Sequence, residues 1–393
     1  MDGIWLGIFL ICAALIIYHH AGYPLLLRWY SNKHPLKAVA SSNRGYREQN
    51  KDRVLPSITI LMPAFNEELW IAEKIRNIAC LDYPQSKLRV LIIADGCTDN
   101  TVHVAESTIQ EAICSEAHFE VIAHEKNRGK VAILNQILPC ISSDITAITD
   151  VSSLISIDAL VIAAKQFGDP EVGVVNSTYH LLNKESSEAA YWHYQNQIKY
   201  RETTLGSTIG SHGALYFIRT ALFEALPTNA INDDFLIPMH IVHKGYRAAY
   251  SPDMNAVELE ATRAGDDFKR RIRISAGNMQ QVVQLFDLFS PRFKGVAFAF
   301  FSGKGLRLLT PYLMIICLIT SGLLSQHLLF LCFFVAQIAI YSLAALAYCF
   351  PYLQRTKPLQ LLTYLVVGHT ANFIGGLRYL LGLENGKWKR ILR

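Results

Sequence analysis

Charged side chains are scarce in this sequence and absent from three long stretches. Asp, Glu, Lys and Arg make up 18% of its 393 residues, whereas about 25% is usual in soluble domains. None occurs between Asp2 and Arg28, in the 47 residues from Leu308 to Gln354, or in the 20 from Pro358 to Leu377. Because a helix needs about 20 apolar residues to cross a bilayer, we expect membrane spans at both ends of the chain, two of them in the 47-residue stretch. The hydrophobic content of 51% excludes a disordered chain.

Basic residues are missing before the first apolar stretch and gather directly after it. A cleavable signal peptide needs a basic start, so this stretch is not one. The basic residues that follow it are Arg28, Lys33, Lys37, Arg44, Arg47, Lys51 and Arg53. By the positive-inside rule they predict that the next domain is cytoplasmic. We therefore expect a multi-pass protein of the cell membrane, whose net charge of +5 reflects orientation in the bilayer and not nucleic-acid binding.

Several familiar cofactor motifs are also missing. The eight cysteines form no C-x-x-C pair and no zinc spacing. Neither G-x-G-x-x-G nor G-x-x-x-x-G-K-[ST] occurs, which removes the main support for a dinucleotide oxidoreductase and for a P-loop ATPase.

The middle of the chain, from about residue 57 to 290, predicts an α/β domain. Expected strands at 58–62, 88–94, 119–123 and 145–149 alternate with expected helices at 67–80, 98–113 and 130–138, which indicates a mostly parallel sheet. Ligands of such sheets bind at the carboxyl ends of the strands, where this sequence places Asn66-Glu67, Asp95 and Asp150. Acidic residues beside a phosphate need a cation between them, so these positions indicate a divalent metal that holds a diphosphate.

Five segments in this region carry a family resemblance. They are Pro63-Ala-Phe-Asn-Glu67, Ala94-Asp-Gly-Cys-Thr-Asp-Asn-Thr101, Asn127-Arg-Gly-Lys130, Thr149-Asp-Val-Ser152 and Asn232-Asp-Asp-Phe235. In this order they resemble the membrane-bound family 2 glycosyltransferases with a GT-A fold, nearest to the exopolysaccharide branch that includes cellulose, chitin-oligosaccharide and poly-N-acetylglucosamine synthases. The resemblance runs from Ile58 to about Gln281 and implies a Rossmann-like α/β catalytic domain flanked by transmembrane helices.

The resemblance implies a nucleotide-sugar site with a metal. Its donor-binding residues are expected to be Ala64, Asn66, Glu67, Asp95, Lys130 and Asp150. In the family a D-x-D segment binds the metal, whereas here the segment reads Asp150-Val-Ser152. Asp150 and the weaker hydroxyl ligand Ser152 are therefore the expected ligands of Mg²⁺ or Mn²⁺. Helix capping by Asn66 and a turn at Asp95 are the structural alternatives.

The resemblance also implies the catalytic and acceptor residues. Asp234, beside Asp233, matches the family's catalytic base, and an acceptor hydroxyl does need a carboxylate to take its proton as it attacks. Arg273 matches the arginine that steadies the leaving diphosphate. The expected acceptor contacts are His212, Gly213 and Arg270, with a structural histidine as the alternative. Ile274 stands where processive synthases have Trp, which weakens a prediction of long-chain synthesis.

The expected function is inverting transfer of a sugar, from a UDP-sugar, to a polysaccharide or lipid-linked acceptor in cell-envelope biosynthesis. Transfer to a polyprenyl phosphate and an inactive scaffold that binds nucleotide sugar stay open, as do partners in export or polymerisation. The expected domains are a transmembrane helix at 1–29, a basic linker at 30–56, the GT-A catalytic domain at 57–284, an interfacial helix at 285–304, about three hydrophobic transmembrane segments within 305–382, and a basic tail at 383–393. The segment 359–382 is atypical, because a full span there would put the basic tail outside.

Overall fold

The computed structural model describes residues 2–36, 50–182, 187–259 and 264–384. The chain divides into two compact units, 1–33 with 263–385, and 34–262 with 386–393. Residues 37–49 of the expected linker 30–56 and residues 385–393 of the basic tail 383–393 lie outside the described residues.

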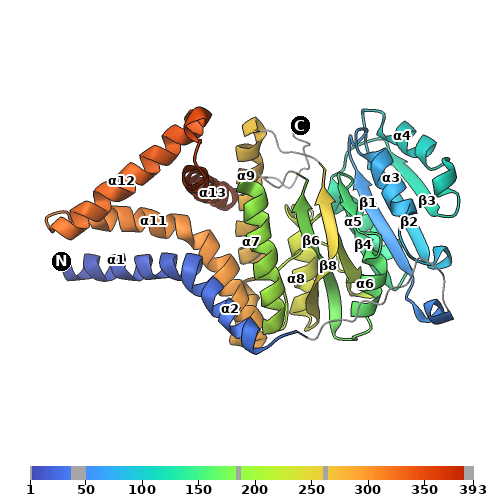
Figure 1. Cartoon of the computed structure of the whole chain (residues 1–393), viewed down its shortest axis with the longest axis horizontal. Coiled ribbons are helices and arrows are strands. Elements are labelled where there is room, and N and C mark those ends of the chain that lie inside the picture. The colour runs from blue at the N-terminus through green and yellow to red at the C-terminus, as the bar shows by residue number, and fades with distance from the viewer. Residues whose placement is uncertain (1, 37–49, 183–186, 260–263, 385–393) are drawn as a thin grey trace. The chain divides into compact units, whose positions relative to one another are not determined.

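The second unit is built on an eight-stranded mixed sheet (Figure 1). Its strands lie in the order β3-β2-β1-β4-β7-β6-β8-β5. Their bounds are β1 Ile58–Ala64, β2 Leu88–Asp95, β3 His118–His124, β4 Ile145–Ile148, β5 Ser153–Ile155, β6 Val172–Leu181, β7 Tyr216–Arg219 and β8 Arg247–Glu258. The helices of this unit are α3 Ile71–Ala79, α4 Thr101–Thr108, α5 Lys130–Ile137, α6 Ala159–Gln166, α7 Ser187–Glu202 and α8 Asp233–His243.

The first four strands form one parallel part of the sheet, and β6 and β8 form another parallel pair. β1 pairs in parallel with β2 and with β4, and β2 pairs with β3. Every residue of β1 and β4 is buried, as expected for strands that are covered on both faces. The chain moves outward from β1 to β3 and then returns to the other side of β1 at β4. The strand order therefore reverses between β1 and β4, which is where sheets of this kind bind ligands.

Two of the three expected helices begin later than the sequence pattern indicates, whereas α5 begins at Lys130 as expected. α3 starts at Ile71 instead of residue 67, because the chain first makes a turn in which Trp70 N donates to Glu67 O. α4 starts at Thr101 instead of residue 98. Asn100 is the N-cap residue, and the Asp99 carboxylate just before it accepts a hydrogen bond from Thr101 N, 3.0 Å away.

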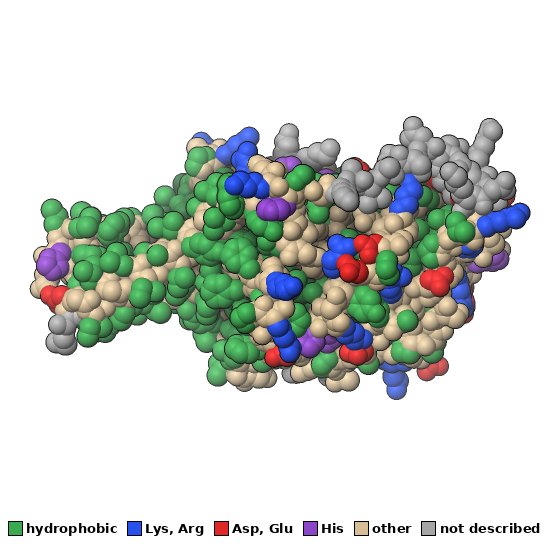
Figure 2. Space-filling view, turned by 90° about the horizontal axis from the view of Figure 1, so that it is seen from below, with side chains coloured by type: hydrophobic (Ala, Val, Ile, Leu, Met, Phe, Trp, Pro, Cys, Tyr) green, Lys and Arg blue, Asp and Glu red, His purple; other side chains and the backbone are tan. Residues whose placement is uncertain are grey.

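The first unit consists of helices. They are α1 Asp2–Ile17, α2 Tyr23–Lys33, α9 Ala264–Gln284, α10 Gly295–Ala299, α11 Leu306–Leu323, α12 Leu328–Cys349 and α13 Lys357–Leu380. One π-helical turn joins α1 to α2 and another joins α10 to α11. Within the described residues, three helical segments are long and apolar enough to cross a bilayer: Asp2–Lys33, Gly295–Leu323 and Leu328–Cys349. These helices mark the chain as membrane-associated, and Figure 2 shows how densely hydrophobic side chains cover their surface.

Two expectations about the C-terminal half change. The residues 295–304, expected in a separate interfacial helix, continue into α11 as one apolar segment. α13 is not among the candidate spans and packs closely on α9 instead. A Cβ on Gly375 would lie 2.4 Å from Ile272 O, so the missing side chain lets the two helices approach. This contact also explains why α9, expected in the catalytic domain, clusters with the apolar helices.

Candidate functional site

The ends of β1 and β2 are joined by the side chain of Asn66. Its Oδ1 accepts a hydrogen bond from Thr98 N at 2.8 Å, and its Nδ2 donates to Thr98 Oγ1 at 3.1 Å. Asn66 has a positive φ of 56°, a conformation that asparagine tolerates better than most residues. The adjacent Glu67 N donates to Thr101 Oγ1 at 2.7 Å. Asn66 and Glu67 therefore hold two of the predicted motifs together directly after the buried end of β1 at Ala64.

Asp95 ends β2 and is completely buried. Its Oδ2 accepts hydrogen bonds from Arg128 N at 2.9 Å and from Gly129 N at 2.7 Å. This carboxylate thus fixes the loop that leads into α5 and its first residue, Lys130. The structure gives Asp95 an internal role that the motif alone did not reveal, and its contact with a uracil stays a prediction.

Lys130 connects the end of β4 to the start of α8. Its Nζ lies 2.9 Å from Asp150 Oδ1 and 3.3 Å from Asp233 Oδ2. Burial lowers the pKa of Lys130, but the Asp150 and Asp233 carboxylates outweigh that effect and the net pKa is raised. Burial likewise raises the pKa of Asp150, and the Lys130 ammonium outweighs it, so the net pKa of Asp150 is lowered. Lys130 is therefore a fixed cation and Asp150 a fixed anion at neutral pH.

Asp234 lies in the first turn of α8, as the sequence predicts. Burial, followed by the Asp233 charge, raises the pKa of Asp234 to about 6. Its backbone O accepts a hydrogen bond from Ser211 N at 3.0 Å, which ties α8 to the loop that carries His212 and Gly213. A carboxylate with this pKa is ionised at neutral pH and still basic enough to take a proton.

The loop 210–214 lies beside Asp150. Gly213 O accepts a hydrogen bond from Asp150 N at 3.1 Å. A Cβ on Gly213 would stand 2.7 Å from Asp150 Oδ2, so glycine keeps one side of this carboxylate clear. His212 stacks on Tyr179 with ring centroids 3.7 Å apart and meets Trp192 edge-on at 4.7 Å. His212 Nδ1 accepts from Ala214 N, which leaves Nε2 as the donor in the neutral ring.

The side chains here fit a divalent metal only if the substrate supplies most of its ligands. No group of three His, Cys, Asp or Glu side chains with metal-binding geometry occurs among the described residues. Asp150 has Oδ2 beside the space left by Gly213, while its Oδ1 is bound by Lys130. Ser152 is buried in the same turn. One carboxylate and one hydroxyl suit Mg²⁺ or Mn²⁺ when phosphate oxygens and water complete the coordination.

Two predicted residues belong to the other unit. Arg270 and Arg273 lie on α9 in the helical unit, and both are partly buried. Their roles toward acceptor and diphosphate stay predictions.

Two residues near the site were missed in the sequence. Lys74 is buried on α3 next to the turn that carries Asp150. Its position on the same helix face as Ile71, Ile75 and Ile78 indicates in the sequence that this lysine is buried. Tyr216 at the start of β7 is also completely buried. Burial, followed by the Asp233 charge, raises the pKa of Tyr216 well above its usual value. No sequence signal distinguished it from an ordinary core tyrosine.

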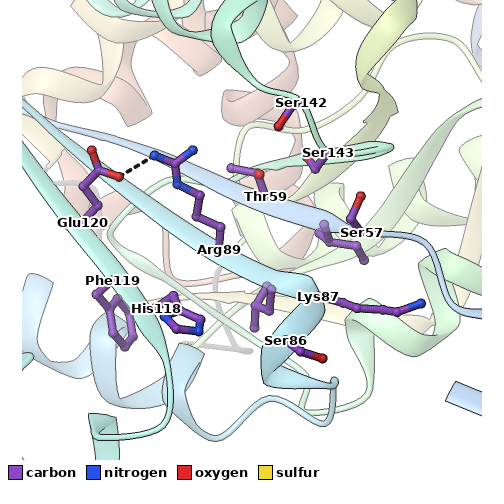
Figure 3. Close-up of a pocket in the computed structure, with 12 residues that line it drawn as sticks. Ser57, Thr59, Ser86, Lys87, Arg89, His118, Phe119, Glu120, Ser142 and Ser143 are labelled. Atoms are coloured by element: carbon purple, nitrogen blue, oxygen red, sulfur yellow. Dashed lines mark hydrogen bonds and ion pairs between the residues drawn. The ribbon is translucent and has the colours of Figure 1, made fainter. Parts of the chain in front are cut away.

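A hollow of about 570 Å³ occurs elsewhere on the sheet (Figure 3). It is lined by the first residues of β1, β2 and β3 with polar neighbours such as Lys87, Arg89 and Ser143. It lies at the amino ends of these strands, whereas Asp95 and Asp150 follow their carboxyl ends. We therefore do not assign the catalytic site to it.

The model of the family described as glycosyltransferase-like family 2 matches residues 56–277, more than half of the chain. The chain belongs to glycosyltransferase family 2. Among curated relatives, this glycosyltransferase is 27% identical over 246 residues to the poly-beta-1,6-N-acetyl-D-glucosamine synthase of Staphylococcus aureus strain COL, covering 60% of this chain and 57% of the relative. It is 30% identical over 156 residues to the beta-monoglucosyldiacylglycerol synthase of Trichormus variabilis, covering 39% of this chain and 32% of the relative.

A solved structure supports the fold of the glycosyltransferase. The mannosyltransferase PcManGT from Pyrobaculum calidifontis, in complex with GDP-Man and Mn²⁺, matches with a TM-score of 0.73 at 24% identity, covering 96% of this chain and 100% of that one. The expected GT-A fold is confirmed by this match. The glycosyltransferase spans little more than half the length of the poly-beta-1,6-N-acetyl-D-glucosamine synthase.

Proposed function

We propose that this glycosyltransferase moves a sugar, with inversion, from a nucleotide sugar to a hydroxyl of a saccharide or lipid-linked acceptor. One observation carries the proposal: Asp234, a carboxylate with a pKa of about 6, stands beside the Lys130 contacts to Asp150 and Asp233. This arrangement combines a base for the acceptor with fixed charges for a diphosphate. The site lies at the strand ends where the sheet order reverses.

The mechanism is a single displacement. Asp234 takes the proton of the acceptor hydroxyl while its oxygen attacks the anomeric carbon, and the nucleoside diphosphate leaves from the opposite face. Lys130 offers positive charge near the leaving group. A Mg²⁺ or Mn²⁺ ion held by Asp150, the Ser152 hydroxyl and the diphosphate would neutralise further charge there. Arg273 is expected to add a guanidinium, and no covalent enzyme intermediate is needed.

The donor is proposed to be a UDP-sugar. This choice follows the resemblance to exopolysaccharide synthases and the name of the N-acetyl-D-glucosamine synthase relative. GDP-Man, which is bound in the PcManGT structure, is the alternative to test. The acceptor is proposed to be a growing polysaccharide or a lipid-linked saccharide at the cytoplasmic face of the cell membrane. The glucosyldiacylglycerol synthase relative supports including lipid acceptors, a polyprenyl phosphate among them, in the assays.

The test is nucleotide release by the full chain, purified in detergent, with a panel of UDP- and GDP-sugars, Mn²⁺, and saccharide and lipid acceptors. We expect one donor to be consumed, and Asp234→Asn to lower kcat by about a hundredfold or more, because the base is lost. Asp253→Asn removes an exposed carboxylate on β8 and serves as the matched control with unchanged activity. Release that is the same in the wild type and in Asp234→Asn for every donor would overturn the proposal in favour of an inactive nucleotide-sugar-binding scaffold.

A further inference from the structure

Lys74 is a buried cation without an assigned role. Within residues 52–182 and 188–259 it is the only Lys or Arg that is fully shielded from solvent, with 0% of its surface exposed. Moving an ammonium group out of water costs several kcal/mol unless it is well bonded. A leucine or methionine at this position of α3 would pack beside Ile71 and Ile78 without that cost. The ammonium therefore needs a reason beyond core packing.

The ammonium binds both sides of the turn that presents Asp150. Lys74 Nζ donates to Thr149 Oγ1 at 2.7 Å and to Ser153 O at 2.5 Å. The Thr149 and Ser153 hydroxyls in turn donate to Ala214 O, at 2.6 and 2.8 Å. The two residues that flank the segment 150–152 are thus anchored to α3 on one side and to the loop before β7 on the other.

The two lysines at this strand end act on different parts of the same segment. Lys130 pairs with the Asp150 carboxylate itself. Lys74 donates to the Thr149 hydroxyl on one side of it and to the Ser153 carbonyl on the other. Burial lowers the pKa of Lys74 to about 7, and the Asp150 charge opposes that effect. The segment has Ser152 where the family pattern has a second carboxylate. Its negative charge is therefore halved, and the buried Nζ of Lys74 donates hydrogen bonds to the residues on either side of it.

We propose that Lys74 is a positioning residue for the donor diphosphate. Its Nζ group fixes the turn 149–153, through its hydrogen bonds to Thr149 and Ser153, in the form that brings Asp150 to the diphosphate. This inference rests on the proposed nucleotide-sugar function. It concerns the phosphate distal to the nucleoside, because the nucleoside is expected at the other motifs, near Asn66 and Asp95.

The test compares the binding of UDP and UMP to the full chain in detergent, with saturating Mn²⁺, by isothermal titration calorimetry. We expect Lys74→Met, which keeps the length of the side chain, to weaken UDP binding about tenfold. UMP binding should change less than about twofold, since UMP has no second phosphate to reach the turn. Thr149→Val keeps the shape of the turn and removes one acceptor of Lys74, so it should shift UDP affinity in the same direction by a smaller factor.

Two controls separate this role from a structural one. Arg76→Met removes a cation from the same helix, where it binds Glu73 and Glu111 on the surface, and should leave both affinities unchanged. Ile75→Val destabilises the buried face of α3 and should lower Tm without changing the ratio of UDP to UMP affinity.

If Lys74→Met fails to fold, Thr149→Val decides. An equal loss for UDP and UMP, or no loss for UDP, would refute the role of Lys74. Absence of binding of UDP and of GDP to the wild type would instead refute the proposed function. If only GDP binds, GDP and GMP replace the uridine pair.

Discussion

At the scale of the residue, the site depends on carboxylates whose surroundings differ. Both carboxylate oxygens of Asp95 accept hydrogen bonds from backbone N–H groups. The Lys130 ammonium keeps Asp150 ionised. Burial and the Asp233 charge raise the pKa of Asp234. The same side-chain type thus serves as a clamp, an anion and a base. The sequence predicts all three as site residues, because they follow strand ends or start a helix. It does not predict that Asp95 binds the backbone of the loop before α5.

The pH dependence of the reaction follows from Asp234. The base must be ionised, and its pKa is about 6, so we expect kcat/KM to fall by about tenfold per pH unit below that pH. Asp233→Asn removes a negative neighbour that raises the pKa of Asp234. The acid limb of the kcat/KM profile should therefore move to lower pH in this variant. An acid limb that stays in place, or moves to higher pH, would show that another group controls it.

At the scale of the element, two loops that follow β2 and β3 are locked against each other. Gly96 has a φ of 68°, and a Cβ there would lie 2.2 Å from Asn127 N. The close backbone approach is what lets Asp95 reach Arg128 and Gly129. Helix α5, with Lys130 as its first residue, is thereby placed by a glycine 34 positions earlier in the chain.

This contact predicts that adding one methyl group at Gly96 lowers the free energy of unfolding strongly. Gly96→Ala meets backbone that cannot rotate away, so we expect a loss of about 2–4 kcal/mol in the free energy of unfolding. Gly245→Ala is the matched control, with a φ of 98° and nothing within 4 Å of the added Cβ, and should cost only about 1–2 kcal/mol. Thermal unfolding of both variants in detergent measures the difference. Equal costs would mean that backbone conformation, not the contact with Asn127, limits this position.

At the scale of the whole molecule, three candidate spans give a consistent topology. If the first span ends inside, the second and third go out and return, and α13 then lies on the inner side. This topology agrees with the positive-inside rule, because the basic residues that follow α13 in the sequence are then expected on the inner side: Lys387, Lys389, Arg390 and Arg393. Treating α13 as a fourth span would break that rule, and its close packing on α9 offers a different burial for its apolar face.

Reporter fusions test this topology. A periplasmic alkaline phosphatase reporter should be active after Gln326, in the turn between α11 and α12, and inactive at Arg393. Green fluorescent protein should show the reverse: it should be fluorescent when fused at Arg393 and not fluorescent when fused after Gln326. Phosphatase activity at Arg393 would establish a fourth span. A fusion within the catalytic domain, after Asp253, provides the reference for the inner side.

The sequence by itself determined the features that depend on local composition and order. Uncharged apolar stretches predicted membrane helices at both ends of the chain. The alternation of strands and helices predicted the α/β sheet, and five short motifs indicated the family. The tertiary structure decided which residues share a charge network. Lys74 and Thr149 are 75 positions apart, Lys130 and Asp233 are 103 apart, and the helices α9 and α13 have α10, α11 and α12 between them in the chain. Such pairs form because a folded sheet brings its strand ends together, and no pattern within a short window of the chain records that distance.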